Sequence, residues 1–258
     1  MGTDRYAYGS KLRRVDPLAK LLADAIPAAV CLAAGSLAVC ILTLVAMFAV
    51  CLKLGGTRGR VVLHLLRIPS GFLLLAVITI AVGRVSANDG LLALQIGVSR
   101  YGVTASSLLE SAEVFARAMS VVMCMYFFTL TTPMTDFTRA LARLHLPRLF
   151  IELMEMIYRF IFVLTDTANR IKTAQASRLG YRDAKTRMKS TGVLASMVFL
   201  RAYRKSDKVF TALEARGYTG ALLTAASDYE SGLVVLITGA FVVCAQILTL
   251  IIVRLING

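Results

Sequence analysis

The sequence has no tryptophan and only two histidines among its 258 residues. His64 and His145 stand far apart, and neither has a second ligand at metal-binding spacing, which argues against a transition-metal site within this chain. The five cysteines lie singly inside apolar stretches without a C-x-x-C pair, so neither a zinc site nor a disulfide framework is indicated. We therefore expect the chain to hold no metal ion and no cofactor.

Charged residues are also scarce, at 17%, whereas hydrophobic residues make up 57% and the mean hydropathy is +0.71. This apolar share exceeds that of soluble domains and argues against an ordinary soluble enzyme. The charge that is present is basic, with 29 Lys and Arg against 15 Asp and Glu, for a net charge of +14. A nucleic-acid partner is not favoured, because such a binder needs aromatic platforms for bases and has no need of long apolar runs. The composition favours a membrane protein.

Four apolar blocks are candidates for membrane spans, and each span requires about 20 residues. The blocks cover residues 18–54, 68–83, 116–132 and 232–253. The first is about twice as long as one span requires. Gly35 and Ser36 near its middle are compatible with one tilted helix or with two short spans joined by a tight turn.

Segment charges favour two spans in the first block. The net charge is +3 up to Lys20, +4 over 53–67, 0 over 84–117 and +10 over 139–218. By the positive-inside rule, five spans place the N-terminus and both basic loops in the cytoplasm, and four spans remain the fallback. We expect an all-α integral membrane protein with about five transmembrane helices and a cytoplasmic module of long amphipathic helices. The expected domains are an N-terminal membrane part at 1–133, the module at 134–220 and a C-terminal transmembrane helix at 221–258.

The module contains two long amphipathic patterns. Apolar residues recur at steps of three and four from Pro147, and this helix is expected to stop at Gly180. After a polar break at 182–190, a second pattern runs from Val193 to Gly217. Both helices are too charged to span a membrane, so we expect them to lie at its inner surface or to project from it. A shorter amphipathic helix is expected from about Val103, running into the third apolar block.

The two long helices end alike, in Ser177-Arg178-Leu179-Gly180 and in Ala215-Arg216-Gly217. Routine capping is one explanation, with glycine in the left-handed conformation and arginine near the negative end of the helix dipole. The other is that two guanidinium groups are presented to partner proteins, since an arginine fork pairs bidentately with carboxylates. The periodicity alone favours capping.

Three segments resemble a known family: DRYAYGSKLRRVDPLAK, LHLPRLFIELMEMIYRFIFVLTDTANRIKTAQASRLGY and FLRAYRKSDKVFTALEARGYTG. They are similar to the transmembrane T component of energy-coupling factor transporters, most closely its cobalt and nickel branch, CbiQ. The resemblance implies a scaffold in the bacterial inner membrane that binds two ATP-binding-cassette ATPases. It also implies a CbiM-like substrate-binding membrane subunit and a small CbiN-like accessory membrane subunit.

Carried onto this sequence, the resemblance makes Arg178 and Arg216 the residues that meet the ATPases. The positions beside them are Ser177, Leu179, Ala215 and Gly217. The second motif matches Ala-Arg-Gly in full. The first reads Ser-Arg-Leu with its glycine displaced by one residue, which leaves the backbone path after the first helix open.

Two classes of function remain at this point. The first is a non-enzymatic scaffold of a cobalt importer, with nickel or a vitamin as alternative substrates. The second is a membrane enzyme that acts on anionic lipids through the basic segment 139–218. No D-x-x-D, H-E-x-x-H or P-loop is present, so catalysis is not expected and ATP must bind another chain. Asp24, inside the first apolar block, is expected to form an interfacial ion pair or to mark a displaced helix start.

Overall fold

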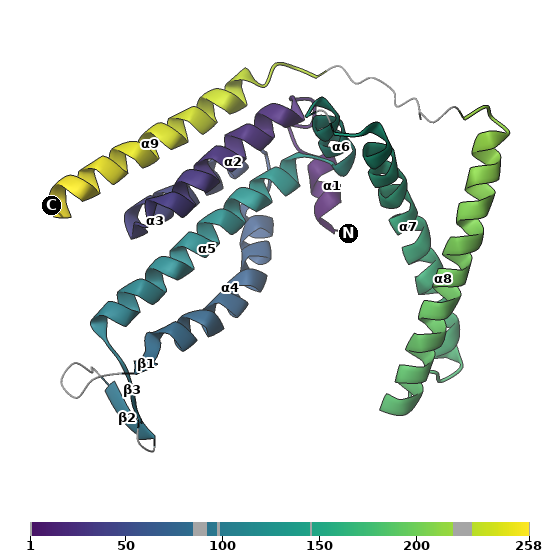
Figure 1. Cartoon of the computed structure of the whole chain (residues 1–258), viewed down its shortest axis with the longest axis horizontal. Coiled ribbons are helices and arrows are strands. Elements are labelled where there is room, and N and C mark those ends of the chain that lie inside the picture. Colours follow the sequence, from purple (N-terminus) through teal and green to yellow (C-terminus); the bar gives the residue numbers. More distant parts are fainter. Residues whose placement is uncertain (1, 85–91, 97–98, 145, 219–228, 258) are drawn as a thin grey trace. The chain divides into compact units, whose positions relative to one another are not determined.

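The computed structural model describes residues 2–84, 92–96, 99–144, 146–218 and 229–257. It divides the chain into two compact units, which we call the membrane unit (residues 1–137 and 227–258) and the module (residues 138–226). Figure 1 labels the helices and strands of both units. The C-terminal helix belongs to the same compact unit as the N-terminal helices. The functional domains expected at 1–133, 134–220 and 221–258 stay a prediction.

The membrane unit contains five apolar helices among the described residues. They are α2 (Pro17–Ala34), α3 (Leu37–Lys53), α4 (Gly59–Ala81), α5 (Ala105–Thr131) and α9 (Leu233–Asn257). All but α3 are long and apolar enough to cross a membrane, and α3 is a shorter apolar helix of 17 residues. A short helix, α1 (Gly2–Tyr8), precedes them. The expected all-α membrane fold is confirmed.

The first apolar block is divided in two, as its glycine and serine suggested. Gly35 adopts the left-handed conformation with φ of 55°, which ends α2, and Ser36 is extended before α3 begins. At the other end of α2, the Asp16 side chain accepts a hydrogen bond from the Leu18 amide at 3.1 Å. Pro17 occupies the first turn, where its missing N–H costs nothing.

The core of the membrane unit forms around α5, which packs against α2, α3 and α4, while α9 packs on α2 and α3 (Figure 1). Side chains of α5 such as Met123, Phe127 and Leu130 are fully buried there. Helices α2 and α9 approach closely, because a Cβ atom at Gly239 would come within 2.8 Å of the Ala23 Cβ. Small residues at such contacts are typical of helices packed within a membrane.

A buried polar network also joins three of these helices. The Gln246 side-chain nitrogen on α9 donates to the Thr43 hydroxyl on α3 at 2.6 Å and to the Pro27 carbonyl on α2 at 3.0 Å. Hydrogen bonds of this kind satisfy polar side chains where lipid offers no partner. The network therefore ties α9 to the hairpin formed by α2 and α3.

A small antiparallel sheet, which the sequence did not predict, precedes α5. Its strands are β1 (Val82–Arg84), β2 (Leu92–Ile96) and β3 (Ser99–Val103), in the order β1-β3-β2. Helix α5 then begins at a capping box formed by Thr104 and Ser107 and continues without a break to Thr131. The expected helix running into the third block is thus confirmed.

The module is an antiparallel pair of long helices, α7 (Arg148–Ser177) and α8 (Ala184–Glu214) (Figure 1). The short helix α6 (Met134–Arg143) leads into it. The polar break expected at 182–190 was wrong, because α8 begins at Ala184. The amide of Arg187 donates to the Asp183 carbonyl at 2.8 Å, so the polar residues form the exposed first turns of the helix.

Candidate coupling site at the two helix ends

Helix α7 ends in a left-handed turn that satisfies its last carbonyl groups with backbone amides. Leu179 follows Arg178 with φ of +58°. Its amide donates to the Ala176 carbonyl at 3.0 Å, and the Gly180 amide donates to the Gln175 carbonyl at 2.9 Å. This pair of bonds is the Schellman motif.

Helix α8 ends in the same motif. Gly217 follows Arg216 with φ of +72°. Its amide donates to the Glu214 carbonyl at 2.9 Å, and the Tyr218 amide donates to the Leu213 carbonyl at 3.0 Å. The two arginines therefore occupy the same position, one residue before the left-handed residue, and the displaced glycine of the first motif does not alter the backbone path.

One expectation about capping was wrong, because the left-handed residue of the first helix end is Leu179 and not a glycine. The left-handed conformation costs a residue with a Cβ atom about 1–2 kcal/mol. Gly180 is needed for another reason, since a Cβ atom there would lie 2.8 Å from the Gln175 carbonyl oxygen and 2.9 Å from Ser190 Oγ. The Leu179 side chain is 68% exposed, so packing within the module does not explain its strained backbone.

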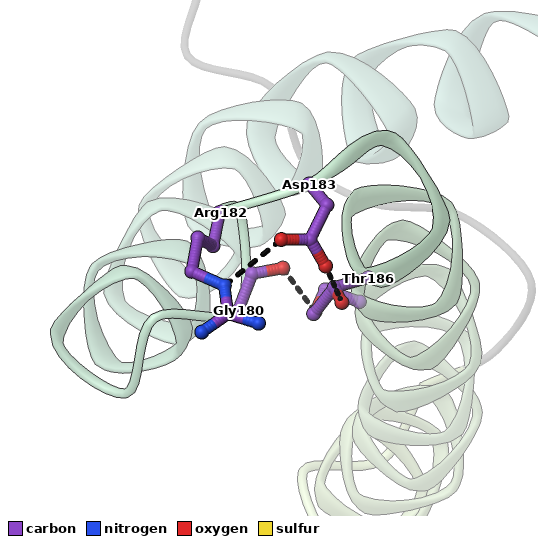
Figure 2. Close-up of polar contacts among 5 residues, drawn as sticks. Gly180, Arg182, Asp183 and Thr186 are labelled. Carbon is purple, nitrogen blue, oxygen red and sulfur yellow. Dashed lines mark hydrogen bonds and ion pairs between the residues drawn. The ribbon is translucent and has the colours of Figure 1, made fainter.

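The turn after α7 is fixed to the start of α8 by side-chain hydrogen bonds (Figure 2). Arg182 Nε donates to Asp183 Oδ1 at 2.9 Å, and the Thr186 hydroxyl donates to Asp183 Oδ2 at 2.7 Å. These two donors hold the pKa of the Asp183 carboxyl below its usual value, with the Thr186 hydrogen bond as the larger cause. The Ser190 hydroxyl donates to the Gly180 carbonyl at 2.7 Å. These residues were not among the predicted site residues, because they lie within or beside the segment expected to be a polar break.

The chain after α8 is tied back to the start of α7. The Tyr218 hydroxyl donates to Glu152 Oε2 at 2.8 Å, and this bond raises the pKa of Tyr218 because it favours the protonated phenol. The carboxylate of Glu152 is thus a hydrogen-bond acceptor within the hairpin.

The two arginines lie at opposite ends of the hairpin, because α7 ends at its turn and α8 ends at its open end (Figure 1). Helix α8 has 31 residues, which corresponds to a length of about 45 Å. Both side chains are exposed, and within the described part of the chain neither has an ion pair or a side-chain hydrogen bond. The arrangement suits contacts with two separate partners better than joint binding of one small ligand.

No alternative site competes with the helix ends among the described residues. In the ranges that the structure covers, no group of three or more His, Cys, Asp and Glu side chains lies together to hold a metal ion. His64 is exposed on α4, and His145 lies outside the described residues. The cysteines that form the nearest pair, Cys31 and Cys40, are free thiols with 3.6 Å between their sulfur atoms.

Neither expectation for Asp24 is met: it has no ion pair among the described residues, and it does not mark a displaced helix start, because α2 begins at Pro17. It is 8% exposed within the membrane unit, and its Oδ1 atom has no hydrogen-bond partner among the described residues. The nearby Lys20 turns instead toward the end of α5, where its Nζ donates to the Thr131 carbonyl at 3.2 Å.

Comparison with known proteins decides the family. The profile of CbiQ, described as cobalt transport protein, matches residues 9–225. The chain belongs to the CbiQ family. The resemblance of the N-terminal and module segments is therefore confirmed, as is the expectation of a transport component of the energy-coupling factor type.

Three relatives illustrate the similarity. The cobalt transport protein CbiQ of Salmonella typhimurium is 32% identical over 155 residues, covering 59% of this chain and 68% of that protein. A putative fused cobalt transport protein CbiMQ of Methanocorpusculum labreanum is 37% identical over 128 residues, or 50% of this chain and 21% of the relative. The energy-coupling factor transporter transmembrane protein EcfT of Listeria innocua is 28% identical over 84% of each chain. The match thus covers less than two thirds of the fused protein's own length.

Proposed function

We propose that this CbiQ-family chain is the membrane scaffold of an energy-coupling factor importer for cobalt ions. In this proposal it is not an enzyme: two ABC-type ATPases bind its module, and a CbiM-like membrane subunit captures the substrate. Cobalt is preferred over nickel or a vitamin because the names of the CbiQ and CbiMQ relatives specify cobalt transport. A small CbiN-like membrane subunit completes the proposed complex.

The observation that carries the proposal is the repeated helix end with an exposed arginine at the same position. In both Schellman motifs the last carbonyl groups are bonded by backbone amides, so neither guanidinium is needed as a cap. This favours the partner-binding role that periodicity alone left second to capping. A guanidinium without an intramolecular partner among the described residues can form a bidentate bond with a carboxylate or contact backbone carbonyls of another protein.

The proposed roles follow from these positions. Arg178 and Arg216 each enter a groove of one ATPase. The neighbouring residues Ser177, Leu179, Ala215 and Gly217 form the rest of each contact. The separation of the two ends along α8 allows one hairpin to bind two ATPase subunits at the same time.

The proposed orientation follows from the charge distribution. The N-terminus and residues 139–218 face the cytoplasm, where ATP is available, because these segments carry the excess of Lys and Arg. Residues 84–117, with no net charge, face outward. The membrane is the bacterial inner membrane.

Co-purification tests the proposal. The tagged chain is expressed with its candidate ATPase and CbiM-like subunits, extracted in mild detergent and analysed for recovered ATPase. We expect stoichiometric recovery with the native chain, partial loss with Arg178→Ala or Arg216→Ala, and near-complete loss with both changes. Arg201→Ala is the matched control, because Arg201 is an exposed arginine in the middle of α8. Failure of the native chain to recover any ATPase would contradict the scaffold function and favour the lipid-modifying alternative.

A further inference from the structure

A lysine is completely buried at the start of α2. Lys20 is 0% exposed, and its Nζ donates to the carbonyl of Thr131, the last residue of α5, at 3.2 Å. The negative charges of Asp136 and Asp16 attract this ammonium group through space. A buried ammonium group is retained in a fold only where such partners surround it.

The acidic partner Asp136 stands where the chain leaves the membrane unit. Residue 137 is the last of this unit before the module, and residue 227 is the first after it. Asp136 is 8% exposed on α6, and its Oδ1 accepts a hydrogen bond from the Tyr229 hydroxyl at 3.0 Å. A side-chain hydrogen bond therefore joins the outgoing connection of the module, which contains Asp136, to its returning connection, which contains Tyr229 and Glu230.

The returning connection is also bonded to the segment before α2. The Glu230 amide donates to the Arg14 carbonyl at 2.8 Å, and the Asp16 amide donates to the Glu230 carbonyl at 3.3 Å. Val15 and Glu230 form an isolated parallel bridge. Both connections of the module thus converge on the first turn of α2 and the last turn of α5, two helices that pack against each other (Figure 1).

We infer that Lys20, Asp136 and Tyr229 form a connector clamp that passes displacement of the module to helices α2 and α5. The inference rests on the proposed function, because it assumes that ATPases move the module. Breaking the bond between Lys20 and Thr131 would leave a buried ammonium group without its hydrogen-bond partner, which is strongly unfavourable. Lys20 therefore holds α2 to the end of α5, and Asp136, Tyr229 and the backbone bonds of Glu230 hold the two connections to each other and to the start of α2. A displacement of either connection is transmitted to α2 and α5. They act as positioning residues and do not contact substrate.

The experiment measures, for each variant, the Co²⁺ uptake per ATP hydrolysed and the thermal stability. The complex is reconstituted in liposomes, and ATP hydrolysis and uptake of radioactive Co²⁺ are measured for Tyr229→Phe, Asp136→Asn and Lys20→Met. Gln246→Leu is the matched control, because Gln246 is equally buried in a polar network of the same unit but lies away from both connections. Thermal unfolding in detergent is recorded for every variant.

For Tyr229→Phe, which removes a single oxygen atom, we expect normal ATPase recovery and near-normal hydrolysis. Cobalt uptake per ATP hydrolysed should fall about fivefold or more, as for loss of a typical coupling between sites. Gln246→Leu should lower the unfolding temperature and leave uptake per ATP unchanged. Asp136→Asn should resemble Tyr229→Phe, and Lys20→Met should show the largest loss.

Unchanged uptake per ATP in Tyr229→Phe and Asp136→Asn would overturn the inference and leave the clamp a purely structural element. The same holds if Gln246→Leu uncouples transport to the same degree. If Lys20→Met does not fold, Tyr229→Phe and Asp136→Asn still test whether the clamp transmits displacement. Failure of the proposed function itself is recognised separately, because the native complex would then contain no ATPase.

Discussion

Replacing Gly217 by alanine tests the left-handed end of α8 without a steric clash. Gly217 has φ of +72°, and a Cβ atom built there meets no other atom within 4 Å. The left-handed conformation costs alanine about 1–2 kcal/mol. Alanine also lowers the conformational entropy of the unfolded chain, and this offsets about 0.4–1 kcal/mol of the conformational cost. We therefore expect Gly217→Ala to destabilise the helix end by about 1 kcal/mol, which is roughly a fivefold change in its opening equilibrium.

Amide hydrogen exchange measures this effect where it occurs. The Tyr218 amide donates to the Leu213 carbonyl across the turn, so its exchange should become about fivefold faster in the variant. Gly192→Ala is the matched control, because Gly192 lies inside α8, away from both ends, and a Cβ atom there also meets nothing within 4 Å. This second change should stabilise the helix by about 1 kcal/mol, since alanine is the better helix former. Equal effects of the two substitutions would refute the left-handed helix end.

The reverse change, Leu179→Gly, tests why the other end retains a strained leucine. Removing the Cβ atom should relieve about 1 kcal/mol of strain at φ of +58°. Little burial is lost, because the side chain is 68% exposed. We expect slower amide exchange at Gly180 together with weaker recovery of ATPase, as for a leucine that packs against a partner. Stabilisation with undiminished ATPase recovery would show that Leu179 makes no such contact.

The remaining predictions concern the guanidinium fork, topology and metal binding. Arg216→Lys keeps the charge but loses the planar fork, so ATPase recovery should lie nearer to that of Arg216→Ala than to that of the native chain. Truncating such an arginine at a buried contact costs about 2–5 kcal/mol of binding free energy. Recovery equal to that of the native chain would argue against bidentate binding. Cysteine labelling should place 53–67 and 139–218 in the cytoplasm and 84–115 outside, and an external module would end the scaffold interpretation. The isolated chain should bind no stoichiometric Co²⁺ in calorimetric titration, and tight binding abolished by His64→Ala would overturn this.

The division of the first apolar block could be predicted because Gly35 and charge placement give a local signal for a turn. The start of α8 could not be predicted from the same kind of signal. The polar composition around Asp183 and Thr186 predicts a break between helices. In the structure these residues instead belong to the first turn of α8, where hydrogen bonds from Arg182 and Thr186 to Asp183 and from Ser190 to Gly180 stabilise the turn. The sheet formed by β1, β2 and β3 was missed for a related reason, since its pairing joins strands whose sequences show no clear alternation of apolar and polar residues.

The sequence predicts the residues of the candidate site but not the backbone geometry of the two helix ends. The paired arginines were visible as a repeated motif, and the family resemblance singled them out. The left-handed residue of the first end was not visible, because sequence favours glycine there and the chain uses Leu179. The connector clamp was also hidden, since only the tertiary fold brings Lys20 to Thr131 and Tyr229 to Asp136.

The most direct test of the coupling role is ATP-driven uptake of radioactive Co²⁺ by the complex carrying both Arg178→Ala and Arg216→Ala. Uptake is measured beside the native complex and the Arg201→Ala control, at matched amounts of this chain in the membrane. The proposed function predicts that the double variant inserts normally but loses uptake, while the control retains it. Full uptake with normal ATPase recovery in the double variant would show that both arginines are only part of helix ends, and would contradict the coupling mechanism.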